Sequence, residues 1–152
     1  MAERLVVYDS YFGNTAQVAE AIGKALGATV RKADAIQPAD LEGLKILVVG
    51  SPTRAFNATE GAKAFLQAQK GQLAGVKGGV FDTRILVENT NSGFLKFMVR
   101  LFGYADTKLA KGFKNTGADL VVEPAGFAVL ESEGPLAEGE LERAAQWAET
   151  IL

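Results

Sequence analysis

Histidine and cysteine are both absent from this chain of 152 residues. Without cysteine there is no disulfide, no thiol nucleophile and no thiolate ligand for zinc or an iron–sulfur cluster. Without histidine there is no Ser-His-Asp or Cys-His pair, no imidazole metal ligand and no imidazole that titrates near neutral pH. We therefore expect neither a metal site nor catalytic residues, and any difficult chemistry would have to come from a cofactor.

A basic excess and long apolar runs are also missing. The 16 Lys and Arg residues are outnumbered by 18 Asp and Glu residues, whereas a nucleic-acid-binding protein needs a basic footprint. No apolar run approaches the roughly 20 residues of a membrane span. Residues 1–4 lead directly into an apolar run too short for the core of a signal peptide. We expect a cytoplasmic protein with no nucleic-acid partner and no stable membrane insertion.

The composition is that of a globular protein, with 48% hydrophobic and 22% charged residues. A chain of this length buries enough surface for one core without covalent staples. Internal repeats, low-complexity segments and linkers are not evident in the sequence. We expect residues 1–152 to form a single domain.

Short aliphatic runs alternate with amphipathic helical stretches. The helix that follows the first run has an apolar face at Val18, Ile22 and Leu26, and Gly27 lies where a left-handed C-cap is expected. Two further helical faces lie within 58–66 and 141–152. The predicted strands are 4–9, 29–33, 44–49, 79–85, and a fifth that is interrupted between 120–122 and 127–130.

Strands that alternate with helices predict an α/β fold with a parallel sheet and helices on both faces. Five strands favour a doubly wound sheet of order 2-1-3-4-5. Ligands bind such sheets beyond the carboxyl ends of the strands, where the strand order reverses. The candidate site is therefore formed by the loops 9–15, 50–59 and 82–104.

The loop after the first strand reads Asp-Ser-Tyr-Phe-Gly-Asn-Thr from Asp9 to Thr15 and opens a helix. Backbone N–H groups at a helix N-terminus form an anion site, and Ser10, Asn14 and Thr15 add neutral donors. The loop lacks the Gly-Lys-Ser/Thr of a Walker loop, and without Lys or Arg it suits a single phosphate. The alternative is an ordinary N-cap in which Asn14 or Thr15 closes the helix.

Three loops carry a resemblance to the flavodoxin family. The segment VVYDSYFGNTAQVAEAI resembles the family's phosphate-binding loop, Ser/Thr-x-Thr-Gly-Asn-Thr, in a form similar to the flavodoxin modules of flavodiiron proteins. GSPTRAF resembles the first flavin-flanking loop, and VFDTR opens the second. The C-terminal stretch from VVEPAGFAVL onwards resembles small single-domain flavodoxin-like proteins, so the likeness covers nearly the whole chain.

This resemblance implies FMN as the cofactor. Its phosphate would bind to the first loop, and its ring would lie between the loop around Pro52 and the loop after Asp82. Phe12 replaces the middle threonine of the family pattern and would remove one phosphate hydrogen bond, worth about 1.5–3 kcal/mol. The residues expected to contact FMN are Ser10, Tyr11, Phe12, Gly13, Asn14, Thr15, Pro52, Thr53, Arg54, Phe56, Asn57, Asp82, Thr83 and Arg84.

The connection 82–104 is long for a loop between a strand and a helix. Within it, the segment Phe94 to Phe102 has the spacing of an amphipathic helix. It is interpreted as a satellite helix packed on the domain or, alternatively, as a lid or a docking patch for a partner.

Cations in the site loops suggest a redox hypothesis. Arg54, Arg84, Lys96 and Arg100 would stabilise reduced, anionic FMN relative to the flavin of strongly acidic flavodoxins. The alternative is that Arg54 and Arg84 point into solvent or pair with Asp82 and Glu88.

The resemblance implies a carrier that shuttles electrons between redox protein partners, rather than an enzyme with its own substrate. The first alternative is an FMN-dependent reductase of quinone-type acceptors that uses NAD(P)H. The second is a flavin-free interaction module, for which Phe12 is the main support. On the last helix, Trp147 is expected to pack, and Glu138, Glu140, Glu142 and Glu149 are expected to form a solvated face.

Overall fold

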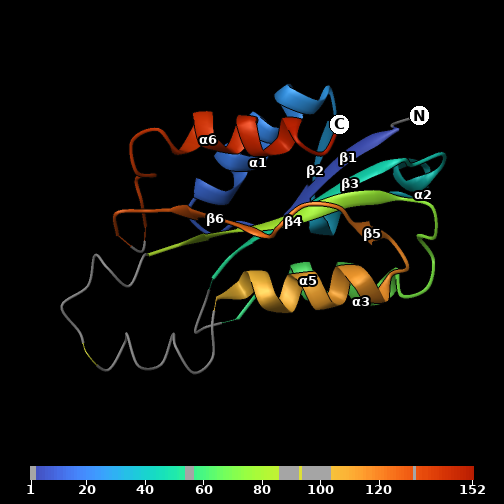
Figure 1. Cartoon of the computed structure of the whole chain (residues 1–152). Helices are drawn as coiled ribbons and strands as arrows, with labels where there is room; N and C mark the ends of the chain where they lie inside the picture. Colours follow the sequence, from blue (N-terminus) through green and yellow to red (C-terminus); the bar gives the residue numbers. More distant parts are fainter. Residues whose placement is uncertain (1–2, 54–56, 86–92, 94–103, 132) are drawn as a thin grey trace.

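A computed structural model describes residues 3–53, 57–85, 93, 104–131 and 133–152. Its centre is a parallel sheet of order β2-β1-β3-β4-β5, with β6 also paired to β4. Helices α1 and α6 cover one face of this sheet, and α3 and α5 cover the other (Figure 1). The predicted doubly wound α/β fold and its strand order are confirmed.

The described strands and helices follow the predicted alternation. The strands are β1 (Arg4–Tyr8), β2 (Thr29–Lys32), β3 (Ile46–Pro52), β4 (Lys77–Arg84), β5 (Asp119–Leu120) and β6 (Ala125–Ala128). The helical elements are α1 (Asn14–Leu26), the 3-10 helix η1 (Ala33–Ala35), α2 (Pro38–Leu41), α3 (Glu60–Ala68), α5 (Ala105–Asn115) and α6 (Glu140–Glu149). Helix α5 was not predicted from the sequence.

The interrupted fifth strand is two short strands that share one neighbour. β5 pairs with the beginning of β4 through Gly78 and Leu120, and β6 pairs with its end through Phe81 and Ala125. Pro124 lies between them and has no N–H group for a ladder hydrogen bond. The break therefore divides the edge of the sheet into two parts, of which β6 lies at the carboxyl end.

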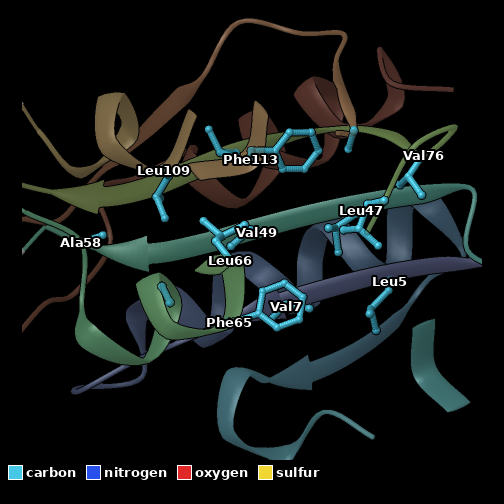
Figure 2. Close-up of a cluster of buried hydrophobic side chains, with 14 of the residues drawn as sticks. Leu5, Val7, Leu47, Val49, Ala58, Phe65, Leu66, Val76, Leu109 and Phe113 are labelled. Carbon is cyan, nitrogen blue, oxygen red and sulfur yellow. The ribbon is translucent and has the colours of Figure 1, made fainter. Parts of the chain in front are cut away.

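Alternate strand residues face opposite helical layers, because successive side chains of a strand point to opposite faces. In β1 and β3 one set packs against α3 and α5, where Phe65, Leu109 and Phe113 are buried (Figure 2). The other set packs against α1 and α6. Hydrophobic side chains on both faces of the sheet are buried, with exposed fractions of 0–9%. This packing holds the sheet between the two helical layers.

Phe81 lies at the centre of the α1 and α6 layer. Its ring is fully buried and makes edge contacts with Phe127 and Trp147 at centroid distances of 6.0 and 6.4 Å. A Cβ atom at Gly50 would lie 2.0 Å from the Phe81 ring, so β3 must have glycine where it passes the ring. The packing role predicted for Trp147 is confirmed.

The interpretation of Glu140 as part of a solvated face is wrong. Its side chain is buried, and it accepts hydrogen bonds from the Ala128 N–H at 2.6 Å and from Arg143. The hydrogen bond from Arg143 lowers the pKa of Glu140. Arg143, whose side chain is half exposed, also donates to the Gly126 carbonyl, so α6 is tied to β6 by both members of the Glu140–Arg143 pair.

Across the described ranges, no helix is long and apolar enough to cross a membrane.

Replacing Phe81 by alanine should lower the free energy of unfolding by about 3–5 kcal/mol, because it empties a site enclosed by two aromatic rings. Urea denaturation followed by circular dichroism measures the change. Leu152→Ala serves as the control, since Leu152 is 55% exposed, and it should change stability by less than about 0.5 kcal/mol. Equal effects of the two substitutions would contradict this account of the core.

Candidate functional site

A cavity of about 390 Å³ opens at the carboxyl edge of β1, β3 and β4. This is the edge at which doubly wound sheets bind ligands. The cavity is lined by residues from the loop after β1, the end of β3, the end of β4 and the segment after β6. Its lining residues are Ser10, Tyr11, Phe12, Asn14, Thr15, Pro52, Thr53, Thr83, Arg84, Ile85 and Val129.

The N-terminus of α1 faces this cavity without a side-chain cap. Its N-cap is Gly13, at a left-handed φ of 91°, and among the described residues no side chain caps the first turn. The first turn also contains no acidic residue, so the partial positive charge of the helix end is not neutralised there. The alternative that Asn14 or Thr15 closes the helix as an ordinary N-cap is therefore wrong.

The loop before α1 is held by its own polar side chains. The Ser10 hydroxyl accepts a hydrogen bond from the Gly13 N–H at 3.0 Å, and Asp9 accepts one from the Ser10 N–H at 2.9 Å. Thr15 is buried, and its hydroxyl lies 2.8 Å from the Thr83 hydroxyl, which connects the loop to β4. These contacts gather neutral hydroxyl donors around the helix end.

Two aromatic residues stand at the outer rim of the loop. The side chains of Tyr11 and Phe12 are 59% and 48% exposed, and both line the cavity. Phe12 therefore lies at the cavity but provides no hydroxyl to the α1 N-terminus.

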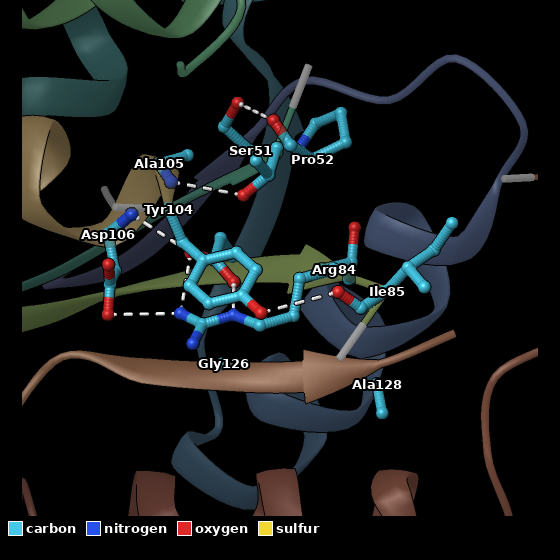
Figure 3. Close-up of polar contacts among 12 residues, drawn as sticks. Ser51, Pro52, Arg84, Ile85, Tyr104, Ala105, Asp106, Gly126 and Ala128 are labelled. Carbon is cyan, nitrogen blue, oxygen red and sulfur yellow. Dashed lines mark hydrogen bonds and ion pairs between the residues drawn. The ribbon is translucent and has the colours of Figure 1, made fainter. Parts of the chain in front are cut away.

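Hydrogen bonds of Ser51 and Thr53 fix the path of the second loop where it leaves β3. The buried Ser51 hydroxyl accepts from the Thr59 N–H at 3.0 Å and donates to the Pro52 carbonyl at 2.9 Å (Figure 3). Thr53 donates its N–H to the Thr83 carbonyl, and its hydroxyl accepts from the Ala105 N–H at 3.0 Å. Pro52 and Thr53 are thereby fixed along one wall of the cavity.

The floor behind Arg84 is a buried network of charges. The carboxylate of Asp82 is fully buried and accepts two hydrogen bonds from the Arg84 guanidinium, at 2.6 and 2.7 Å. It accepts a third from the Asp106 N–H at the start of α5, at 2.9 Å. The Asp106 carboxylate completes the network with an ion pair to Arg84 at 3.0 Å (Figure 3).

Burial raises the pKa of Asp82 to about 6, against the opposing effect of its hydrogen bonds to Arg84. Burial would lower the pKa of Arg84, but the carboxylates of Asp82 and Asp106 raise it above its ordinary value. Asp82 is therefore mostly ionised at neutral pH and becomes protonated in mildly acidic solution.

Arg84 also fixes the positions of two neighbouring segments. Its guanidinium lies 3.9 Å from the centroid of the Tyr104 ring, and the Tyr104 hydroxyl donates to the Ile85 carbonyl at 3.4 Å. A Cβ atom at Gly126 would lie 2.1 Å from the Arg84 guanidinium carbon, so a side chain at this position would displace the guanidinium from its place. The network joins the end of β4, the start of α5 and β6.

This network bears on the hypothesis that cations in the site loops favour the reduced flavin. Arg84 is paired with Asp82, as the alternative held, and also with Asp106. With two carboxylates to one guanidinium, the cluster contributes a net negative charge rather than a cation. Arg54, Glu88, Lys96 and Arg100 lie outside the described residues.

Most of the predicted site residues do meet at the cavity. Asp82 lies behind the wall and does not line it, and Gly13 contributes the turn that ends at α1. Asn57 is not among the lining residues; its side chain accepts from the Ala58 N–H at 2.8 Å. Arg54, Phe56 and the segment Phe94 to Phe102, which was considered as a lid or docking patch, lie outside the described residues.

Sequence reasoning missed Ile85, Val129 and the role of Asp106. Val129 reaches the cavity because β6 pairs with the end of β4, a register that no local pattern indicates. Asp106 lies in the first turn of α5, where acidic residues are favoured, but that helix was not predicted. No cluster of carboxylates suited to a metal ion occurs within the described part of the chain.

A family model described as a flavodoxin domain matches residues 5–116. The chain belongs to the flavodoxin family. No curated protein matches this flavodoxin-family chain in sequence.

Solved structures of flavodoxins share the fold of this family member. An archaeal flavodoxin is 20% identical, with 97% of this chain and 94% of that chain covered and a TM-score of 0.70. Flavodoxin 2 from Bacillus cereus is 21% identical, with 99% and 97% covered and a TM-score of 0.75. The rubredoxin oxygen:oxidoreductase of Desulfovibrio gigas is 20% identical over 97% of this chain but only 34% of its own, with a TM-score of 0.71.

The raised pKa of Asp82 predicts a pH-dependent stability. Between its ordinary pKa of 3.8 and its folded value of about 6, the folded protein holds a proton that the unfolded chain releases. The free energy of unfolding should therefore fall by up to about 3 kcal/mol as pH rises through this window. Asp82→Asn removes this contribution.

Urea denaturation of the wild type and of Asp82→Asn at several pH values between about 4 and 7 measures it. The stability difference between the two proteins should be larger at the acidic end and should become constant above about pH 7. Parallel pH profiles for the two proteins would show that burial does not raise the pKa of Asp82.

Proposed function

We propose that this flavodoxin-family protein binds FMN non-covalently in the cavity and carries electrons between redox protein partners. The observation that carries the proposal is the uncapped N-terminus of α1, which opens into the cavity beside neutral hydroxyl and amide side chains. Helix N-termini of this kind hold phosphate groups through backbone N–H groups and the helix dipole. Family membership makes a flavin phosphate the favoured ligand.

The phosphate would be held by the first turn of α1 together with Ser10, Asn14 and Thr15. The first N–H groups of an α-helix have no partner within the helix, and here no side chain replaces one. A Cβ atom built at Gly13 would meet no atom of the described residues within 4 Å, so a ligand can approach the backbone closely there. These backbone donors would offset the hydroxyl that Phe12 does not provide.

The flavin ring would lie against the other walls of the cavity. Pro52, Ile85 and Val129 give apolar contact, and Thr53 is fixed beside them by its hydrogen bonds to β4 and α5. A volume of about 390 Å³ lies within the range of small-molecule sites. When bound, FMN would supply the one- and two-electron redox chemistry.

The exposed rim of the cavity supports a carrier that meets a partner protein. Tyr11 and Phe12 at the rim would leave one side of the site accessible to a partner protein.

Ser10→Ala tests the phosphate site. Loss of the hydroxyl removes one donor to a dianionic ligand and the contact that shapes the loop, so FMN should bind about 10- to 100-fold more weakly. Quenching of FMN fluorescence on titration measures the affinity. Riboflavin, which lacks the phosphate, is the matched control and should bind to the variant and the wild type equally.

If wild-type protein leaves FMN fluorescence unchanged, the flavin-binding proposal fails and an interaction module is favoured. An equal loss of affinity for riboflavin would place the effect of Ser10 on the ring rather than on the phosphate. Rapid oxidation of NAD(P)H by the FMN-loaded protein alone, without a partner, would instead support a reductase.

Asp106→Asn tests the charge balance beside the flavin. The substitution leaves Arg84 with one carboxylate in place of two, so the reduction potential of bound FMN should rise by tens of millivolts. Redox titration with reference dyes measures the potential. Asp119→Asn is the matched control, because Asp119 lies in β5 beside Lys77, at the opposite end of β4. Equal shifts in the two variants would contradict a local effect.

A further inference from the structure

Charge is unevenly distributed along this chain. Residues 57–118 contain nine Lys or Arg and four Asp or Glu, whereas residues 119–152 contain one basic and eight acidic residues. The acidic part includes α6, on one face of the sheet, and the basic part includes α3 and α5, on the other (Figure 1). Among the described helical residues, α1 and α6 have four acidic and two basic residues, whereas α3, the following Lys70 and α5 have five Lys and two acidic residues. The face formed by α3 and α5 is therefore the more basic of the two.

The basic side is hollowed between α3 and α5. A groove of about 230 Å³ runs there, and four lysines line it: Lys63 and Lys70 from α3 and its C-terminal extension, and Lys108 and Lys111 from α5. Gly112 lets the two helices approach, since a Cβ atom there would lie 3.0 Å from Leu66. The close helix contact forms the floor and leaves the lysines on the two rims.

Intramolecular ion pairs use only part of this charge. Lys63 pairs with Glu60 at 3.0 Å. Lys70 and Lys111 are exposed, and neither has an ion pair in the part of the chain that the structure describes. One exposed lysine on each rim is therefore available to a carboxylate from another molecule.

The groove runs along α5 away from the candidate flavin site. The first turn of α5 contacts the cavity wall, where the Ala105 N–H donates to Thr53. The groove begins at Lys108, one turn later, and extends to Asn115, whose carbonyl accepts from the Gly71 N–H ahead of β4. A partner seated in it would therefore cover the side of the molecule between the cavity and the amino edge of the sheet.

We propose that the groove between α3 and α5 is the docking surface for a protein partner with an acidic surface. Lysine is a flexible, strongly hydrated point charge that suits carboxylates at a solvated rim. Arginine, which binds phosphates in bidentate fashion, is not among the described residues that line the groove. Complementary rim charges guide such encounters and make them sensitive to salt.

The test uses a fluorescein-labelled oligoglutamate peptide as an acidic probe, with binding followed by fluorescence anisotropy at low ionic strength. Lys70→Gln combined with Lys111→Gln removes one exposed charge from each rim. We expect roughly threefold to tenfold weaker binding than for the wild type. Added salt should weaken binding of the wild type more than that of the variant.

Lys24→Gln combined with Lys32→Gln is the matched control. It removes the same charge from exposed positions in α1 and β2, away from the groove, and should leave the affinity near that of the wild type. Equal weakening in both double variants would show a general charge effect and overturn the proposal. So would the absence of peptide binding at low salt.

Two further probes distinguish other polyanions. Tighter binding of single-stranded DNA, or of vesicles containing phosphatidylserine, with the same dependence on Lys70 and Lys111 would overturn an acidic protein partner in favour of a nucleic acid or a membrane. The proposal does not depend on FMN binding. The affinity for FMN, measured for the same variants, should be unchanged. This measurement shows whether a negative result concerns the docking groove or the flavin site.

Discussion

The buried carboxylate of Asp82 is the constraint on which the site depends. A charge without exposure to water must be compensated, and here the Arg84 guanidinium and the Asp106 N–H in the first turn of α5 do so. Three segments distant in sequence must therefore meet at one point: the end of β4, the start of α5 and β6 at Gly126. These contacts fix one wall of the cavity. The net charge behind that wall is set by two carboxylates, those of Asp82 and Asp106, and one guanidinium, that of Arg84.

The opposite wall follows a different principle. At the α1 N-terminus the chain leaves the helix uncapped, although a Ser, Thr, Asn or Asp at the N-cap would stabilise it by about 1 kcal/mol. Gly13 occupies the N-cap position at a positive φ, and hydroxyl side chains gather around the helix end without closing it. Stability that a cap would provide is given up where an anion can take its place. A local sacrifice of this kind is expected at a binding site.

The features that the sequence predicted well are those with a local cause. Strand order followed from alternating strands and helices, and the loop around Gly13 from its residue types. The features missed depend on contacts between distant segments. Pairing of Arg84 with Asp82 was one of the sequence alternatives, but its second carboxylate, Asp106, is known only once β4 and α5 are brought together. Glu140 resembles part of a solvated face until its contact with the Ala128 N–H is known. Helix α5 was missed although its buried residues Ala105, Leu109 and Phe113 follow the i, i+4, i+8 spacing of a helix face.

The central claim is that an FMN phosphate occupies the N-terminus of α1 while the ring lies between the ends of β3 and β4. A crystal structure of the protein grown with FMN tests it most directly. The account predicts a phosphate contacting the first-turn N–H groups and Ser10, with the ring against Pro52, Thr53 and Val129. A flavin bound elsewhere, or one whose phosphate points away from Gly13 into solvent, would contradict it.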